Sequence, residues 1–240
     1  MTKRNESPPT PPRPVFLLHG WSGSARTTWA PFRWSEELRN RGFSPHAIDL
    51  LGHGDASAPH DPAAYVDIAS HTAKAFEGHN QIDVIGFSMG AKITLALAAR
   101  MPHRFRRIIV SGVGENVFRP ERVGMVADSM EHGLSDAVPE RVRDLAAMAF
   151  ASGNDVLALA ACMRRESTPL TRDQVAAIEV PVLVAVGDLD PIAGDPRPLV
   201  AALPNATMIR LPGIDHVGTP YARDFRSAAI EFLARDEETK

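Results

Sequence analysis

The chain has 240 residues, of which 44% are apolar and 23% are charged, and its formal net charge is −3. These values are typical of one globular domain with a full core, and neither the net charge nor any Lys/Arg-rich stripe indicates a nucleic-acid partner. No apolar run approaches the ~20 residues that a membrane span needs. Cys162 is the only cysteine, so no internal disulfide can form, and a cytoplasmic protein is expected.

Residues 1–14 are polar and rich in proline and lack the apolar segment of a signal peptide, so they are predicted to be a disordered leader. After them, short apolar runs alternate with helical patterns. Strands are predicted over residues 15–18, 44–50, 82–87, 107–111, 180–186 and 206–211. Helices are predicted over residues 31–41, 61–77, 89–101 and 221–235. This alternation predicts an α/β fold with a doubly wound, mainly parallel, six-stranded sheet.

One stretch departs from the alternation. Residues 112–179 carry helical patterns and no convincing strand, although a crossover between parallel strands needs only about a dozen residues. The helical patterns cover residues 120–130, 139–151, 156–165 and 171–178. We therefore expect an inserted helical unit above the carboxyl ends of the strands, where doubly wound sheets bind ligands. The core would then consist of residues 15–111 and 180–235.

The most informative motif is Gly-Phe-Ser-Met-Gly at residues 86–90, between a predicted strand and a predicted helix. In this context Gly-x-Ser-x-Gly makes a turn so tight that its two flanking positions must lack side chains. The serine is left at the apex in a strained conformation with an exposed hydroxyl, which is what a nucleophile requires. Ser88 is therefore the candidate nucleophile.

A serine hydroxyl needs a base to take its proton at neutral pH. Among the nine histidines, His216 is the best placed, because it follows the last predicted strand. Its imidazole in turn needs an acceptor that fixes the tautomer and stabilises the imidazolium. Asp190 is preferred for this role and Asp188 is the alternative, since both follow the penultimate strand and emerge at the same edge as Ser88 and His216. His53, in a glycine-flanked turn, is expected to make a structural hydrogen bond.

The tetrahedral oxyanion of acyl transfer needs two backbone donors, and losing one typically removes ~2.7–4 kcal/mol of transition-state stabilisation. One donor is expected to be the N–H of Met89, at the positive end of the helix that follows the serine. The other is expected from residues 19–23, with the sequence His-Gly-Trp-Ser-Gly, where the N–H of Trp21 is the best candidate. The Trp21 ring can also serve as a lid on the pocket, because that role leaves its amide free.

Five short motifs together resemble the α/β-hydrolase superfamily over nearly all of residues 15–235. They are His-Gly-Trp at 19–21, Gly-His-Gly at 52–54, the serine motif at 86–90, Gly-Asp-Leu-Asp at 187–190 and Asp-His at 215–216. The order Ser, Asp, His is that of the superfamily, in which the acid lies three positions after the glycine, and this favours Asp190. The resemblance also implies that residues 112–179 form a helical cap. The chain is similar to small, capped bacterial esterases, lactonases, perhydrolases and carrier-protein methyl esterases.

Three departures narrow this resemblance. The nucleophile is serine, whereas haloalkane dehalogenases and epoxide hydrolases attack with aspartate. Phe87 occupies the position at which carbon–carbon bond hydrolases of aromatic catabolism usually carry asparagine. Two N-terminal antiparallel strands that are common in the superfamily have no counterpart in residues 1–14, so a trimmed, six-stranded sheet is expected.

These features predict a serine hydrolase that cleaves a carboxylic ester, or a related lactone or thioester, through an acyl-enzyme. The alternatives are a perhydrolase or acyltransferase, a carbon–carbon bond hydrolase, and a non-catalytic small-molecule receptor on the same fold. The chain shows neither metal-ligand spacing nor a dinucleotide fingerprint, so a small-molecule acyl substrate is expected and no cofactor. Cys162 is expected to pack in a buried helix, and Arg164 and Arg165 either meet a substrate carboxylate or lie in solvent.

Overall fold

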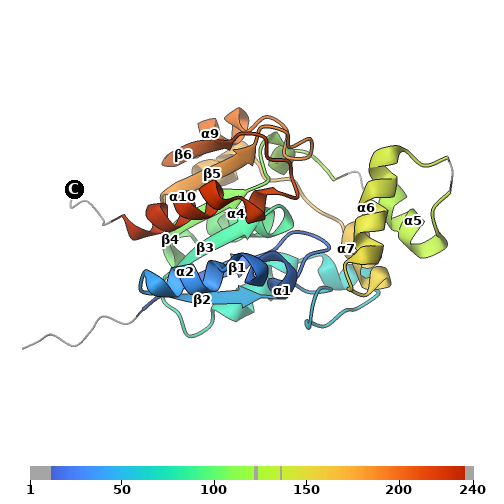
Figure 1. Ribbon diagram of the computed structural model, residues 1–240, viewed down its shortest axis with the longest axis horizontal. Coiled ribbons are helices and arrows are strands. Elements are labelled where there is room, and N and C mark those ends of the chain that lie inside the picture. Colours follow the sequence, from blue (N-terminus) through green and yellow to red (C-terminus); the bar gives the residue numbers. More distant parts are fainter. Residues whose placement is uncertain (1–11, 122–123, 136, 236–240) are drawn as a thin grey trace, which may run out of the picture.

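The computed structural model describes residues 12–121, 124–135 and 137–235. Within them, parallel strands form a six-stranded sheet with the order β2-β1-β3-β4-β5-β6 (Figure 1). The strands are β1 (Arg13–Leu18), β2 (Phe43–Ile48), β3 (Ile82–Phe87), β4 (Phe105–Ser111), β5 (Val182–Gly187) and β6 (Ala206–Leu211). The predicted parallel α/β sheet is confirmed. Residues 1–11 of the predicted leader lie outside the described residues, and Arg13 and Pro14 belong to β1.

Successive side chains of a strand point to opposite faces, and here both faces are buried. In β1, Val15 and Leu17 pack on one face, and Phe16 and Leu18 on the other. Helices α1 (Ala25–Thr28), α2 (Trp34–Asn40) and α10 (Arg223–Ala234) lie on the face of Val15. Helices α3 (Ile68–Ala73), α4 (Met89–Arg100), α8 (Arg172–Ala176) and α9 (Arg197–Ala202) lie on the face of Phe16. The continuous apolar runs of the strands therefore reflect burial between two helical layers.

Two predicted helices are interrupted. The helix expected over residues 61–77 is divided into the 3₁₀ turn η2 (Pro62–Tyr65), α3 and the 3₁₀ turn η3 (Lys74–Phe76). The division occurs at Asp67, whose carboxylate accepts the N–H of Ser70 and so begins a new helix. The helix expected over residues 31–41 starts as η1 (Ala30–Phe32), and α2 follows Arg33, which has a left-handed backbone with φ of 59°.

The insertion, residues 112–179, extends from the carboxyl end of the sheet (Figure 1). Its helices α5 (Gly124–His132), α6 (Glu140–Ala151) and α7 (Val156–Arg164) pack around an apolar cluster of their own that contains Met130, Ala146 and Leu159. Helix α7 also reaches the core beside the sheet through Ala161 and Cys162, and α8 packs there through Val175. None of the helices in the described residues is both long and apolar enough to span a bilayer.

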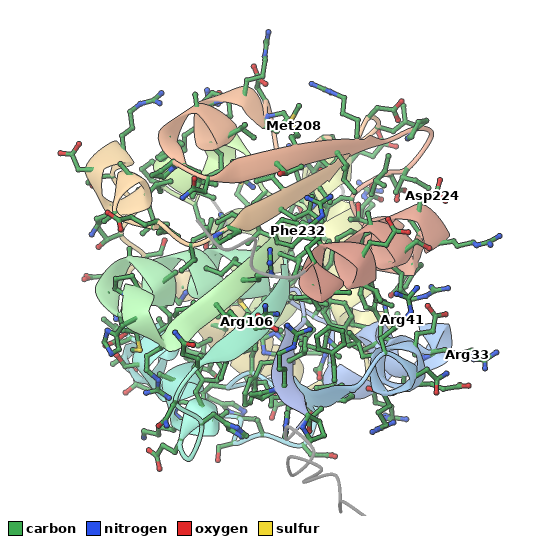
Figure 2. All side chains as sticks on the ribbon, turned by 90° about the vertical axis from the view of Figure 1, so that its left-hand side faces the viewer. Arg33, Arg41, Arg106, Met208, Asp224 and Phe232 are labelled. Atoms are coloured by element: carbon green, nitrogen blue, oxygen red, sulfur yellow. The ribbon has the colours of Figure 1, made fainter. Side chains whose placement is uncertain are left out.

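Figure 2 shows the end of the molecule that faces away from the insertion. There Arg106 of β4 joins β3 to α10, with its Nη2 atom 2.6 Å from the carboxylate of Asp83 and 3.1 Å from the carbonyl oxygen of Leu233. Burial raises the pKa of Asp83 even though Arg106 acts in the opposite direction. These ion-paired groups hold the sheet and its last helix together at the end away from the serine motif.

Candidate active site

Ser88 lies between β3 and α4 with φ of 51° and ψ of −110°. A residue other than glycine in such a sparsely populated backbone conformation is strained by on the order of 1–3 kcal/mol. The surrounding structure must therefore hold the backbone in place. A Cβ atom at Gly86 would lie 2.8 Å from the nitrogen of Ala91, and one at Gly90 would lie 2.3 Å from the carbonyl oxygen of Leu18. Both flanking positions therefore need glycine because the backbone of the turn is packed against its neighbours.

His216 lies in the loop after β6, and its side chain reaches Ser88. Its Nε2 atom lies 3.0 Å from Oγ of Ser88, and its Nδ1 atom lies 2.8 Å from Oδ2 of Asp190. With Nδ1 donating to the carboxylate, Nε2 is left to accept the proton of the hydroxyl. The side chain is largely buried, and its ring packs 5.1 Å from that of Phe87. The structure thus brings the three predicted residues together in one chain of hydrogen bonds.

Asp190 is held by more than the imidazole. Its Oδ1 atom accepts the N–H groups of Ile192 at 2.8 Å and Ala193 at 2.9 Å, and its carboxylate is fully buried. Burial by itself raises the pKa of Asp190. The hydrogen bond and charge of His216, together with the two amides, lower this pKa by more, so the pKa lies below its ordinary value. Asp188, the alternative, is exposed and instead accepts the N–H of Gly213 at 2.7 Å.

The loop of residues 19–23 lies against the serine, because a Cβ atom at Gly20 would be 3.3 Å from that of Ser88. Nδ1 of the buried His19 donates to the carbonyl oxygen of Gly20 at 2.8 Å, and its Nε2 accepts the N–H of Leu50 at 3.0 Å. Burial lowers the pKa of His19 to about 4, so the ring is neutral at pH 7. Among the described residues, the backbone N–H groups of Trp21 and Met89 have no hydrogen-bond acceptor, which leaves both available to a ligand.

Helix α7 of the insertion covers this region. The indole Nε1 of Trp21 donates to the carbonyl oxygen of Leu159 at 3.3 Å, and Sγ of Cys162 lies 3.9 Å from Sδ of Met89. Cys162 is buried, as predicted, and burial raises its pKa to about 11, so the thiol is protonated at neutral pH. The side chains of both candidate donor residues therefore contact the same helix.

Two side chains make contacts that were not anticipated from the sequence. Asn154, in the turn before α7, donates to the carbonyl oxygen of Ser22, and Asp49 accepts the N–H groups of Ala25 and Asp55. Neither residue belongs to a motif, and the contact of Asn154 joins positions 132 residues apart. No local signal could have found it, because it depends on where the insertion packs.

Several charged side chains of the insertion form ion pairs. Arg164 binds Glu131 and Asp128, and Arg165 binds Glu121 at 3.2 Å. Arg164 is exposed, which agrees with one of the two roles considered from the sequence, and Arg165 is partly buried. In the part of the chain that the structure describes, no three His, Cys, Asp or Glu side chains are grouped so as to hold a metal ion.

The sequence model of the alpha/beta hydrolase family matches residues 15–229. Over 102 residues the chain is 34% identical to 2-hydroxy-6-oxo-2,4-heptadienoate hydrolase of Pseudomonas putida, covering 41% of this chain and 37% of that protein. Over 114 residues it is 32% identical to pimeloyl-(acyl-carrier protein) methyl ester esterase of Neisseria meningitidis, covering 45% and 40%. The chain thus spans about two fifths of the length of these relatives.

Two solved structures share the architecture. An enol-lactonase from Burkholderia xenovorans superimposes with a TM-score of 0.74 at 21% identity, over 97% of this chain and 94% of that one. A thermophilic esterase from Thermogutta terrifontis superimposes with a TM-score of 0.70 at 22% identity, over 92% and 89%. At these identities, the likeness shows a common fold.

Proposed function

The chain belongs to the alpha/beta hydrolase family, and on that premise we propose that it is a serine hydrolase acting on a carboxylic ester, or on a related lactone or thioester. Ser88 is the nucleophile, His216 the general base, and Asp190 the carboxylate that orients it. The observation that carries the proposal is the pair of hydrogen bonds at the two nitrogens of His216, 3.0 Å to Ser88 and 2.8 Å to Asp190.

In the first half of the reaction, Oγ of Ser88 attacks the carbonyl carbon of the ester while Nε2 of His216 takes the hydroxyl proton. Asp190 stabilises the resulting imidazolium through Nδ1. The negative charge that develops on the carbonyl oxygen is bound by the N–H groups of Trp21 and Met89. The intermediate then expels the alcohol, which leaves with the proton from Nε2, and the acyl group remains on Ser88.

In the second half, water attacks the acyl-enzyme and gives its proton to Nε2 of His216. The same two N–H groups hold the second oxyanion. Collapse of this intermediate releases the carboxylic acid, and the proton returns to Oγ of Ser88. The general base contributes about 10²- to 10⁴-fold in rate, and each oxyanion donor contributes ~2.7–4 kcal/mol, so both parts are needed for efficient turnover.

The names of several relatives support oxygen esters as the substrate class. A methyl ester esterase, an enol-lactonase and an esterase are among the proteins that this chain resembles. A second candidate is cleavage of a carbon–carbon bond next to a carbonyl, which the likeness to 2-hydroxy-6-oxo-2,4-heptadienoate hydrolase supports. Phe87 argues against this second candidate, because it replaces the usual asparagine of such enzymes. Of residues 112–179, helices α5, α6 and α7 would form the cap over the site in either case, because α8 packs into the core.

The test combines turnover with active-site labelling. Purified protein is assayed with p-nitrophenyl esters of increasing acyl length and is labelled with a fluorophosphonate, whose site is then located by mass spectrometry. We expect labelling at Ser88 and loss of both turnover and labelling in Ser88→Ala. Ser227→Ala, on the exposed face of α10, is the matched control and should resemble the unchanged protein. A Ser88→Ala variant with the original rate, or ester binding without release of p-nitrophenol, would overturn the proposal.

A further inference from the structure

Asn154 connects the insertion to two loops of the core through one side chain. Its Nδ2 atom donates to the carbonyl oxygens of Ser22 at 2.8 Å and Gly23 at 3.3 Å, and its Oδ1 atom accepts the N–H of Gly54 at 2.7 Å. Within its own turn, Nδ2 also lies 3.2 Å from Oγ of Ser152. Both the donor and the acceptor of the amide are therefore used across the boundary between insertion and core.

The two carbonyl groups that Asn154 holds belong to the turn that orients the Trp21 amide. The N–H of Trp21 and the carbonyl of Gly20 share one planar peptide unit and point in opposite directions. The carbonyl oxygen of Gly20 accepts from Nδ1 of His19 at 2.8 Å and from the N–H of Gly23 at 3.0 Å. His19 and Gly23 thus hold the Gly20 carbonyl, which sets the direction of the Trp21 N–H, and Asn154 in turn contacts the carbonyl oxygen of Gly23.

The turn contains a residue with a strained backbone. Ser22 has a left-handed backbone with φ of 61°, which is uncommon for a residue with a side chain. Strain of this kind persists only where neighbouring groups over-determine the backbone. The Asn154 amide supplies two of those constraints, at the carbonyl oxygens of Ser22 and Gly23.

We propose that Asn154 is a positioning residue that holds the oxyanion loop, residues 19–23, in the conformation that aims the Trp21 N–H at the substrate. The inference deepens the proposed serine hydrolase function and rests on it. Helix α7, which begins after Asn154, also contacts the side chains of Trp21 and Met89 through Leu159 and Cys162. The insertion therefore acts on the oxyanion hole as well as covering the site.

The amide is the side chain that meets these requirements, because it offers two donors and an acceptor in one plane. Alanine at position 154 removes all four side-chain contacts. Aspartate keeps an acceptor for the N–H of Gly54 but has no proton for the two carbonyl oxygens while it is ionised. These two variants therefore separate the contact with Gly54 from the contacts with the oxyanion loop.

The first experiment compares the unchanged protein, Asn154→Ala and a matched control, His60→Ala, in ester hydrolysis. His60 pairs with Asp155 at 2.9 Å, so its removal also breaks a contact between insertion and core but leaves the oxyanion loop untouched. Asn154→Ala should lower kcat about 10- to 100-fold, in the range expected for a misplaced oxyanion donor. KM should change less than about threefold, because the oxyanion forms only in the transition state. His60→Ala should keep kcat within about twofold.

The second experiment follows Asn154→Asp between pH 8 and pH 5, each rate being divided by that of the unchanged protein at the same pH. This ratio should rise at least about threefold as the pH falls, because a protonated carboxyl can donate to a carbonyl oxygen. The ratio for Asn154→Ala should stay flat. The other charged groups around this position, Arg26, Asp49, Asp55 and Asp155, are present in every protein compared, so the ratio reports the group introduced at position 154.

The results separate failure of the Asn154 role from failure of the hydrolase proposal. Equal losses in Asn154→Ala and His60→Ala, an unchanged kcat in Asn154→Ala, or a flat ratio in Asn154→Asp would overturn the role of Asn154 and leave the hydrolase proposal intact, provided that fluorophosphonate labels Ser88. Failure of the unchanged protein to be labelled at Ser88 would overturn the hydrolase proposal and, with it, this inference.

Discussion

Asp190 binds Nδ1 of His216 through one carboxylate oxygen at 2.8 Å, while its other oxygen accepts two backbone N–H groups. The carboxylate cannot turn away from the imidazole without giving up those two hydrogen bonds. The ring is therefore held with Nε2 toward Ser88, at 3.0 Å from its hydroxyl. The geometry of the candidate site thus depends on a loop backbone as much as on three side chains.

Replacing Asp190 by Asn should lower kcat by about 10³- to 10⁴-fold, since the amide can donate to Nδ1 and so favour the tautomer whose Nε2 carries a proton. That tautomer cannot accept the serine proton. Asp188→Asn is the matched control and should stay within about threefold of the unchanged rate, because the Asp188 carboxylate accepts the loop N–H of Gly213 and, among the described residues, does not contact His216. Steady-state kinetics on one ester measures both variants, and an equal loss in Asp188→Asn would contradict the assignment of Asp190.

Ser88→Gly should be more stable than Ser88→Ala, although both are inactive. The backbone at Ser88, with φ of 51° and ψ of −110°, is strained for alanine by on the order of 1–3 kcal/mol and is accessible to glycine. Glycine lowers the free energy of unfolding by about 0.5–1 kcal/mol through its greater freedom in the unfolded chain. Ser88→Gly should therefore be more stable than Ser88→Ala by about 1 kcal/mol. Urea unfolding of the two variants measures the difference. A less stable Ser88→Gly would show that the turn stores no strain.

The free energy of unfolding should fall as the pH is lowered from 7 toward 4. The pKa of His19 is about 4 in the folded chain because of burial, and about 6.5 in an unfolded one. Between these values the unfolded state binds more protons, so the stabilisation is complete above pH 6.5 and is lost as the pH approaches 4. The loss from His19 is on the order of 3 kcal/mol.

His53, whose pKa burial lowers to about 3, acts in the same direction. Urea unfolding at several pH values should therefore show a shallower pH dependence in His19→Asn than in the unchanged protein, even though the variant is less stable at pH 7. Parallel curves for the two proteins would mean that His19 is not held in its neutral form by burial.

Gly90→Ala should lower the free energy of unfolding by more than about 2 kcal/mol, because its Cβ would overlap the carbonyl oxygens of Leu18 and His19 at 2.3 Å and 2.7 Å. Turnover should fall more than about 100-fold, since α4 carries the Met89 amide and must move. Gly124→Ala is the control, because it lies in helix α5 and a Cβ there meets no atom of the described residues within 4 Å. It should change stability by less than about 1 kcal/mol. Similar losses in both variants would contradict the steric explanation.

The fold could be predicted because parallel strands buried on both faces leave continuous apolar runs in the chain. The predicted strand at residues 82–87 agrees with β3, and the predicted strand at residues 206–211 agrees with β6. Helices were less predictable. The chain divides at Asp67 because its carboxylate caps a new helix, and a capping contact of this kind competes with helix continuation in a way that apolar periodicity does not show.

The sequence by itself determined the six-strand alternation and the positions of Ser88, His216 and the aspartates after β5, because loops at the carboxyl ends of parallel strands meet at one edge of a sheet. The sequence favoured Asp190 over Asp188 but kept both, and the tertiary structure shows that Asp190 faces the imidazole, since two positions of one loop differ by side-chain direction alone. Only the tertiary structure places Asn154 against the oxyanion loop. Contacts between segments more than 100 residues apart depend on how the layers pack, and local sequence carries no record of that.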